Sequence, residues 1–161
     1  MEIYSKALQL ASLSKDRSVI DLYCGIGIFG MFASLEAGQA IGVELSRESA
    51  YDAKINAARL GLSQFSIQCG DVADVVQKEN FAKGSTVIVD PPRSGLTPQA
   101  LSSVVSLEPD TLIYVSCNPE TQKRDAMLLV EMGWKVEAIQ PVDQFPHTVH
   151  VENILRMKPQ K

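Results

Sequence analysis

Short runs of β-branched residues alternate with longer amphipathic stretches along most of this 161-residue chain. The alternation predicts strand–helix units, because the two kinds of segment have the hydrophobic periods of strands and helices. Five units are expected: strand 18–23 with helix 29–36, strand 39–44 with helix 48–59, strand 65–70 with helix 72–77, strand 86–90 with a helix from near residue 97, and strand 111–116 with helix 119–131.

The last part of the chain follows a different pattern. Segments 134–140 and 150–157 have the composition of strands, and residues 143–149 between them leave no room for a crossover helix. An antiparallel closing pair is therefore expected. The predicted fold class is α/β: a doubly wound, mostly parallel seven-stranded sheet with an antiparallel C-terminal strand, in one domain over residues 1–161.

Charge and cysteine content restrict the function. The net charge of −4 argues against this chain alone holding a nucleic-acid backbone, because that grip comes chiefly from lysine and arginine. Three cysteines without a CxxC pair favour neither a disulfide framework nor a four-cysteine zinc site, so no metal is expected. No apolar run is long enough for a membrane span, and the N-terminus lacks a signal-peptide pattern. We expect a soluble, cytoplasmic protein without a membrane partner.

Polar side chains recur where the predicted strands end. They are Asp21, Glu44, Asp71, Asp90 and Cys117. In open α/β sheets the ligand binds outside the carboxyl ends of the strands. One sheet edge is thus expected to collect four carboxylates and a thiol.

The first unit reads VIDLYCGIGIFG, in which Gly25 and Gly27 predict a tight strand-to-helix turn that admits a ligand close to the backbone. Glu44 closes the second strand, where a carboxylate can accept both ribose hydroxyls of a nucleoside. The glycine pattern alone is also compatible with a nicotinamide site or a purely structural turn.

Two carboxylates favour S-adenosylmethionine over a dinucleotide. Asp21 would repel a pyrophosphate but attract a sulfonium or α-amino group, and Asp71 could accept from the amine of adenine. The alternatives are that Asp71 or Asp74 caps a helix, and that Asp21 acts by ordering the loop.

The fourth and fifth strands lead into candidate reaction residues. Asp90-Pro91-Pro92 predicts a rigid turn suited to base recognition, although a rigid loop with a solvated Arg93 is the alternative. Cys117 lies between a strand and a helix start, whose N–H groups favour a thiolate. Cys24 and Cys69 are more simply interpreted as small buried side chains.

Four segments together resemble the signatures of one family. DLYCGIGIFG, DPPRSGL, YVSCNP followed by RD, and FPHTVHVEN resemble those of the RNA uracil-5-methyltransferases, in the same order, over residues 21–153. The combination of SCNP with HVE is far more specific than the glycine loop.

The resemblance implies a Rossmann-like class I methyltransferase that uses S-adenosylmethionine to form 5-methyluridine in RNA. It implies that Cys117 adds to carbon 6 of the uracil and that Glu152 later removes the proton from carbon 5. The residues then expected to contact the cofactor are Asp21, Tyr23, Gly25, Gly27, Ile28, Glu44, Asp71 and Asp90. Those expected near the substrate are Asp90, Pro91, Pro92, Arg93 and Asn118.

The chain departs from the family in two respects. Ile28 stands where some relatives have a polar cofactor contact. A segment with phenylalanine, glutamine and asparagine before the first helix, and the RNA-binding domains before it, are missing. We therefore expect the C-terminal catalytic domain of a longer protein, with RNA held mainly by the missing domains and weak or no RNA turnover by this chain alone. Ribosomal RNA is favoured over transfer RNA.

Three other functions stay open. The first is a methyltransferase that acts by direct transfer on nitrogen or on a small molecule, which would not need Cys117 or Glu152. The others are a nucleotide-binding module without catalysis and a nicotinamide-dependent oxidoreductase.

Overall fold

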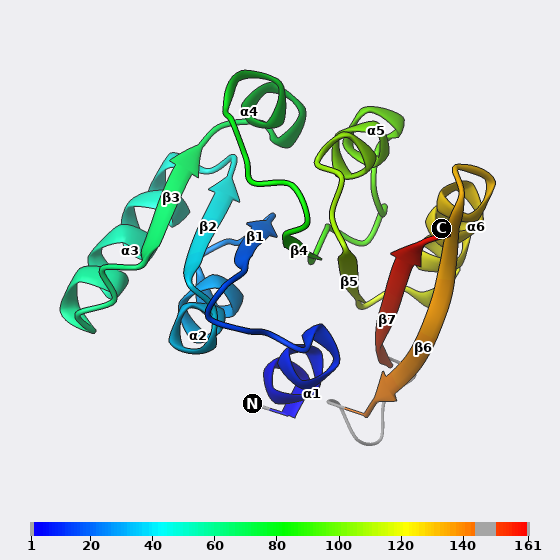
Figure 1. Cartoon of the computed structure of the whole chain (residues 1–161), viewed down its shortest axis with the longest axis horizontal. Helices are drawn as coiled ribbons and strands as arrows, with labels where there is room; N and C mark the ends of the chain where they lie inside the picture. The colour runs from blue at the N-terminus through cyan, green and yellow to red at the C-terminus, as the bar shows by residue number, and fades with distance from the viewer. Residues whose placement is uncertain (1, 144–150, 161) are drawn as a thin grey trace.

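The computed structural model describes residues 2–143 and 151–160. Within them, one seven-stranded sheet has the order β3-β2-β1-β4-β5-β7-β6 (Figure 1). The strands are β1 Ser18–Leu22, β2 Gln39–Glu44, β3 Phe65–Cys69, β4 Thr86–Val89, β5 Thr111–Ser116, β6 Trp134–Val142 and β7 Glu152–Pro159. Strands β1 to β5 pair in parallel, whereas β7 pairs antiparallel with both β5 and β6. The predicted sheet, including its antiparallel C-terminal strand, is confirmed.

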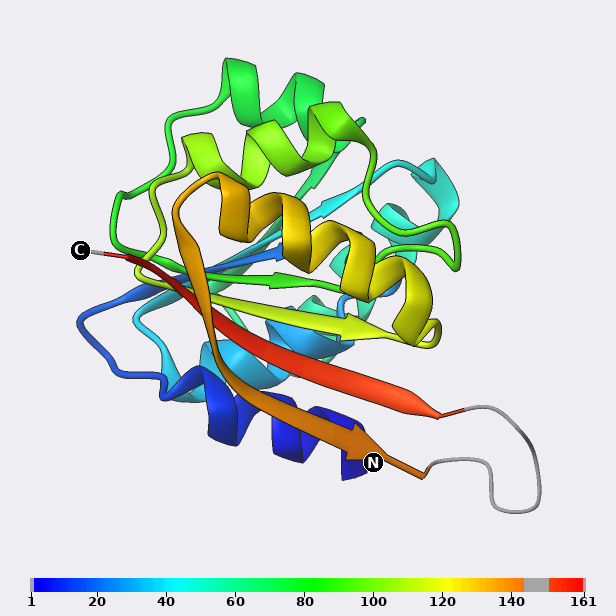
Figure 2. The same cartoon turned by 90° about the vertical axis from the view of Figure 1, so that its right-hand side faces the viewer.

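Helices cover both faces of the sheet. They are α1 Glu2–Ala11, α2 Ile28–Glu36, α3 Arg47–Arg59, α4 Val72–Lys78, α5 Pro98–Ser106 and α6 Pro119–Glu131. Figure 2 shows α4, α5 and α6 over one face and α1 and α2 under the other. The last five helices agree with the sequence prediction within a residue or two. None of the helices in the described part of the chain is long and apolar enough to cross a membrane.

Helix α1 was not predicted from the sequence. Its buried stripe is Ile3, Ala7 and Ala11, spaced four residues apart, and two of the three are small side chains that give a weak periodic signal. The ring of Tyr4 packs against Phe29 of α2 with centroids 4.6 Å apart. This packing brings α1 under the sheet beside β5 and β7.

Two apolar layers hold the helices to the sheet. One contains Leu101 of α5 and Leu129 of α6, and the other contains Phe29 of α2 and Ala57 of α3. Every residue of β5 is buried, as expected for a central strand covered on both faces. The two layers exclude water from both faces of the sheet, and polar side chains are exposed at its carboxyl edge.

The chain reverses its strand order between β1 and β4, which are adjacent in the sheet. Ligands of doubly wound sheets bind at such a switch point, outside the carboxyl ends of the strands. Residues 144–150 lie outside the described residues; they include most of the predicted 143–149 connection, the expected start of the last strand, and His147 and His150 of the FPHTVHVEN segment.

Candidate active site

The carboxyl edge of the sheet collects most of the predicted polar residues. Glu44 ends β2, Asp71 follows β3 by two residues, Asp90 directly follows β4 and Cys117 directly follows β5. Asp21 differs, because it lies within β1 and is fully buried instead of standing at the rim. Of the four expected carboxylates, Glu44, Asp71 and Asp90 therefore lie at the edge of the sheet, and Asp21 is buried inside it.

Hydrogen bonds to Glu44 fix the glycine turn after β1. Gly25 and Gly27 both have positive φ, at 54° and 83°, which glycine adopts without strain. The Oε2 atom of Glu44 accepts the N–H of Gly25 at 2.9 Å, and its Oε1 accepts the N–H of Ser46 at 2.8 Å. A Cβ built on Gly25 meets no atom within 4 Å among the described residues, so this side of the turn is open to a ligand.

Asp21 supports the turn from inside the protein. Its Oδ2 accepts the N–H of Gly30 in α2 at 2.7 Å, whereas its buried Oδ1 has no hydrogen-bond partner in the described part of the chain. Burial raises the pKa of this carboxyl to about 8. The loop-ordering alternative thus agrees with the contacts, and direct contact with a cofactor stays a prediction.

The other predicted cofactor residues, Asp71, Tyr23 and Ile28, lie in different parts of the structure. Asp71 caps α4, with Oδ1 accepting the N–H of Ala73 at 2.8 Å, whereas Asp74 lies inside the helix. Tyr23 has a positive φ of 63°, which is uncommon outside glycine and turns the chain from β1 into the glycine loop. Ile28 lines an apolar hollow with Tyr4 of α1, other residues of α2, and Leu60 and Leu62, which follow α3.

These residues fit the expected S-adenosylmethionine. The turn leaves backbone exposed beside Gly25, and the carboxylate of Glu44 lies next to it. The buried Oδ1 of Asp21 has no hydrogen-bond partner in the described part of the chain. Because the pKa of this carboxyl is raised to about 8, a cationic ligand would favour its ionised form, whereas a phosphate would oppose it. Within the described residues, no group of three or more histidine, cysteine or acidic side chains is arranged to hold a metal ion.

Helix α6 fixes the loop that follows Asp90. Asn118 Nδ2 and Thr121 Oγ1 donate to the carbonyl of Arg93 at 3.0 and 3.1 Å. Arg124 donates to the carbonyl of Ser94 at 2.9 Å. Asn118 also caps α6 through the N–H of Glu120, so its expected substrate role stays a prediction. Pro91 is buried under this loop, whereas Pro92 and Arg93 are exposed.

The carboxylate of Asp125 completes the attachment of the loop. Asp125 is fully buried, and its Oδ2 accepts the N–H of Leu96 and the hydroxyl of Tyr114, both at 2.7 Å. Gly95 has a φ of 78°, and a Cβ there would lie 2.5 Å from the same oxygen. The RD pair of the sequence is therefore a tether for the DPPRSGL loop, a role that the sequence did not reveal.

The antiparallel pairing of β5 with β7 brings the two predicted catalytic residues to the same place. Ser116 pairs with Asn153 in this antiparallel register. Cys117 directly follows Ser116 and Glu152 directly precedes Asn153, so the two residues come next to each other across the strands. Both side chains are partly exposed. This pairing, and not any spacing in the sequence, is what makes them neighbours.

Asp90 stands at the exposed rim beside these residues. Desolvation by the surrounding protein raises its pKa to about 6, and the charge of Glu152 adds to the increase. Tyr4 of α1 also faces this edge: its pKa is raised by burial first and then by the charges of Asp90, Asp21 and Glu152. Tyr4 could not be placed from the sequence because α1 was not predicted.

The two remaining cysteines differ from each other. Cys24 is buried, as expected, and burial raises the pKa of its thiol. Cys69 is exposed at the end of β3, so its interpretation as a buried side chain was wrong. Cys69 is the last residue of β3, and exposure increases along its face from Phe65 through Ile67 to Cys69.

Replacing Asp125 with alanine tests the loop tether. Asp125→Ala leaves the N–H of Leu96 and the hydroxyl of Tyr114 without their acceptor, so we expect a loss of about 3 kcal/mol in the free energy of unfolding. Tyr114→Phe removes only one of these hydrogen bonds and should cost about 1 kcal/mol. Urea titration measures both losses, and limited proteolysis at Arg93 reports release of the loop. Equal losses in the two variants would contradict the tether.

Replacing Asp21 with asparagine tests the buried carboxyl. Because its pKa is raised to about 8, the folded protein keeps a proton that the unfolded chain releases near pH 4. Its contribution to stability is therefore full below pH 4 and is lost as the pH rises toward 8. Unfolding followed from pH 5 to 9 should show a shallower decline in Asp21→Asn than in the wild type. Parallel curves for the two proteins would show that Asp21 ionises normally.

Comparison with known proteins shows the family of this chain. Residues 2–159 match the family model described as tRNA (Uracil-5-)-methyltransferase. An RNA methyltransferase of Protochlamydia amoebophila is 46% identical over 156 residues, covering 95% of this chain and 35% of its own length. One from Caldanaerobacter subterraneus subsp. tengcongensis is 43% identical over 150 residues, covering 93% and 33%.

A solved structure adds the fold. The tRNA (uracil-54, C5)-methyltransferase of Pyrococcus abyssi, in complex with S-adenosyl-L-homocysteine, superposes with a TM-score of 0.80 at 29% identity, covering 95% of this chain and 37% of that one. The chain thus spans about a third of the length of the relatives it matches. From the match over nearly its whole length, the chain belongs to the tRNA (uracil-5-)-methyltransferase family, with the Rossmann-like fold of methyltransferases.

Proposed function

We propose that this chain is the catalytic domain of a longer RNA methyltransferase that transfers a methyl group from S-adenosylmethionine to carbon 5 of a uridine. The observation that carries the proposal is the β5–β7 register, which brings the positions of Cys117 and Glu152 together at the carboxyl edge of the sheet. The edge also has the open glycine turn suited to the cofactor. A thiol and a carboxylate at this place supply the nucleophile and the base that the reaction needs.

The reaction begins with the thiolate of Cys117. Carbon 5 of uracil is too weak a nucleophile to take a methyl group unaided, so the sulfur bonds to carbon 6 and the electrons of the 5,6 double bond move to carbon 5. The bound cofactor supplies an electrophilic methyl group, which carbon 5 takes as the methyl–sulfonium bond breaks. Glu152 then removes the remaining proton from carbon 5, the double bond re-forms and the thiolate of Cys117 leaves.

Other residues of the edge have supporting roles in this proposal. The tethered loop presents Arg93 and the carboxylate of Asp90 beside the reacting base, because α6 binds the loop's carbonyl groups. Asp90 has a raised pKa, so at neutral pH a fraction of it is protonated and can donate to a uracil oxygen. Glu44 and Asp71 would hold the ribose and the adenine.

RNA binding is proposed to depend mainly on other parts of the full-length protein. A uridine must leave its stack at a cost of a few kcal/mol, and a chain of net charge −4 supplies few contacts to phosphates. The proposed substrate is ribosomal or transfer RNA. The frequency of targets in the family favours ribosomal RNA, whereas the family description and the Pyrococcus abyssi relative name transfer RNA. Unmodified transcripts of both kinds therefore belong in every assay.

The first test is covalent trapping of the nucleophile. Full-length protein is mixed with S-adenosylmethionine and transcripts that contain 5-fluorouridine, in which fluorine replaces the proton that Glu152 removes. Intact-mass analysis should detect a methylated protein–RNA adduct, which Cys117→Ala abolishes together with methyl transfer to uridine, by on the order of 10³-fold or more. The exposed Cys69 supplies the control, since Cys69→Ala should form the adduct normally. Undiminished methylation by Cys117→Ala would point to direct transfer instead.

The second test separates the base from the nucleophile. Glu152→Gln keeps the shape of the side chain but cannot accept the proton, so the reaction should stop after methyl transfer. With ordinary uridine transcripts, this variant is expected to accumulate a methylated covalent adduct that the wild type does not. Glu120→Gln, in the exposed first turn of α6, is the matched control. Full turnover by Glu152→Gln would remove Glu152 from the mechanism.

A further inference from the structure

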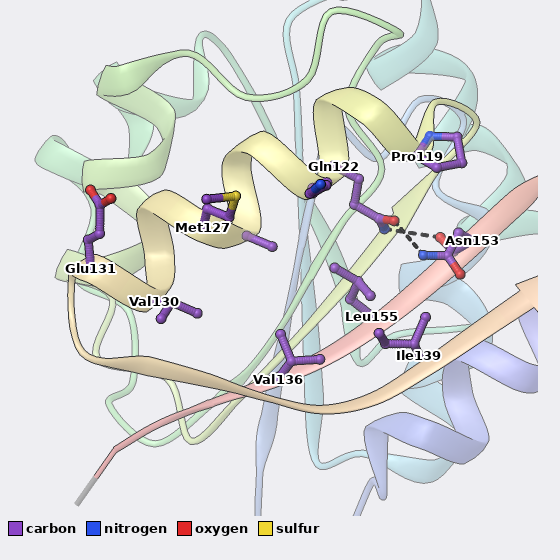
Figure 3. Close-up of a pocket in the computed structure, with 11 residues that line it drawn as sticks. Pro119, Gln122, Met127, Val130, Glu131, Val136, Ile139, Asn153 and Leu155 are labelled. Carbon is purple, nitrogen blue, oxygen red and sulfur yellow. Dashed lines mark hydrogen bonds between the residues drawn. The ribbon is translucent and has the colours of Figure 1, made fainter.

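A buried glutamine joins the helix that follows Cys117 to the strand that begins with Glu152. Gln122 lies in α6 and is only 1% exposed. Figure 3 shows its side chain pointing from the helix toward Asn153 on β7. Polar side chains are costly to bury unless they are hydrogen-bonded, so its contacts need an explanation.

Gln122 uses both of its donors on backbone carbonyl groups of different strands. Its Nε2 donates to the carbonyl of Tyr114 in β5 at 2.8 Å and to the carbonyl of Asn153 in β7 at 3.1 Å. In return, Asn153 Nδ2 donates to Gln122 Oε1 at 2.6 Å. Tyr114 precedes Cys117 by three residues, and Asn153 directly follows Glu152. The amide pair therefore spans the two strand ends that carry the proposed nucleophile and base.

The surroundings of the pair are apolar. Gln122 and Asn153 stand at one end of a groove of about 520 Å³ between α6 and the strands β6 and β7 (Figure 3). Its other walls include Met127, Val130 and Ile139. An apolar side chain at position 122 would pack among these neighbours, but it would lose the hydrogen bonds to both carbonyl groups. Packing alone thus does not account for an amide here.

We propose that Gln122 and Asn153 are positioning residues that set the carboxylate of Glu152 relative to carbon 5 of the uracil held on Cys117. This inference rests on the function proposed above. On one face, α6 binds the loop after Asp90; on the other, Gln122 fixes the start of β7. A single helix thereby sets the distance between the nucleophile, the loop and the base.

The two halves of the reaction depend differently on this pair. Adduct formation and methyl transfer need Cys117 and the cofactor, whereas adduct breakdown needs Glu152 within reach of the carbon-5 proton. A displacement of about 1 Å can slow a step on the order of 10²-fold. Loosening the start of β7 should therefore slow breakdown far more than formation.

The experiment measures both rates in single turnover, with full-length protein, S-adenosylmethionine and uridine transcripts of transfer and ribosomal RNA. Asn153→Ala removes the side-chain bond but leaves the bonds of Gln122 to the backbone. Gln122→Met removes all three. We expect breakdown of the adduct to slow roughly 10-fold or more in Asn153→Ala and further in Gln122→Met, with formation changed less than about 3-fold. The double variant should resemble Gln122→Met, because residues that act as a unit are not additive.

A core variant separates positioning from stability. Val104→Ala truncates a fully buried residue of α5 and lowers the melting temperature without touching the pair. If formation and breakdown fall together in the amide variants, as they should in Val104→Ala, or if neither changes, the positioning role is overturned. If the wild type itself makes no 5-methyluridine, the proposed function fails first and this inference with it. Normal wild-type turnover with unaltered breakdown in both variants rejects the inference alone.

Discussion

The buried carboxylate of Asp125 is the contact on which the candidate site depends most. It accepts hydrogen bonds from the loop after β4, from the hydroxyl of β5 residue Tyr114 and from Arg124 of its own helix. A charged acceptor strengthens such bonds and fixes their directions. Burial also raises the pKa of the Tyr114 hydroxyl, so it stays a proton donor at any physiological pH. Because three elements meet at one carboxylate, the loop cannot shift without moving α6.

Strand direction determines which residues can meet at this edge. The parallel strands deliver their last residues to the carboxyl edge, and Cys117 arrives there after β5. Strand β7 runs the other way, so its first residue, Glu152, arrives at the same edge. A sixth parallel strand in this place would have brought its carboxyl end here and sent Glu152 to the opposite edge. The reversal thus pairs a residue that leaves the sheet with one that enters it.

The sequence predicted those features that follow from local patterns. The bounds of β5 and α6 were predicted correctly, because a β-branched run and a proline at the first turn mark them. What it could not predict depends on tertiary packing. The burial of Asp21 and the inward direction of Gln122 and Asp125 have no signal in a helix or strand pattern, since a polar residue is ordinarily expected to face water. Only the helix, loop and strands packed against these side chains explain their identity.

The carboxylates at this edge make it selective by charge. Burial raises the pKa of Asp21 to about 8, and desolvation together with Glu152 raises that of Asp90 to about 6. Both shifts mean that the ionised form of each carboxyl group lacks compensating positive charge among the described residues. A cationic ligand relieves that deficit and favours the ionised carboxylates, whereas a phosphate increases it. On the proposed function, an RNA would bring an uncharged base into this edge while its backbone is bound mainly by other parts of a longer protein, and this chain spans about a third of the length of its relatives.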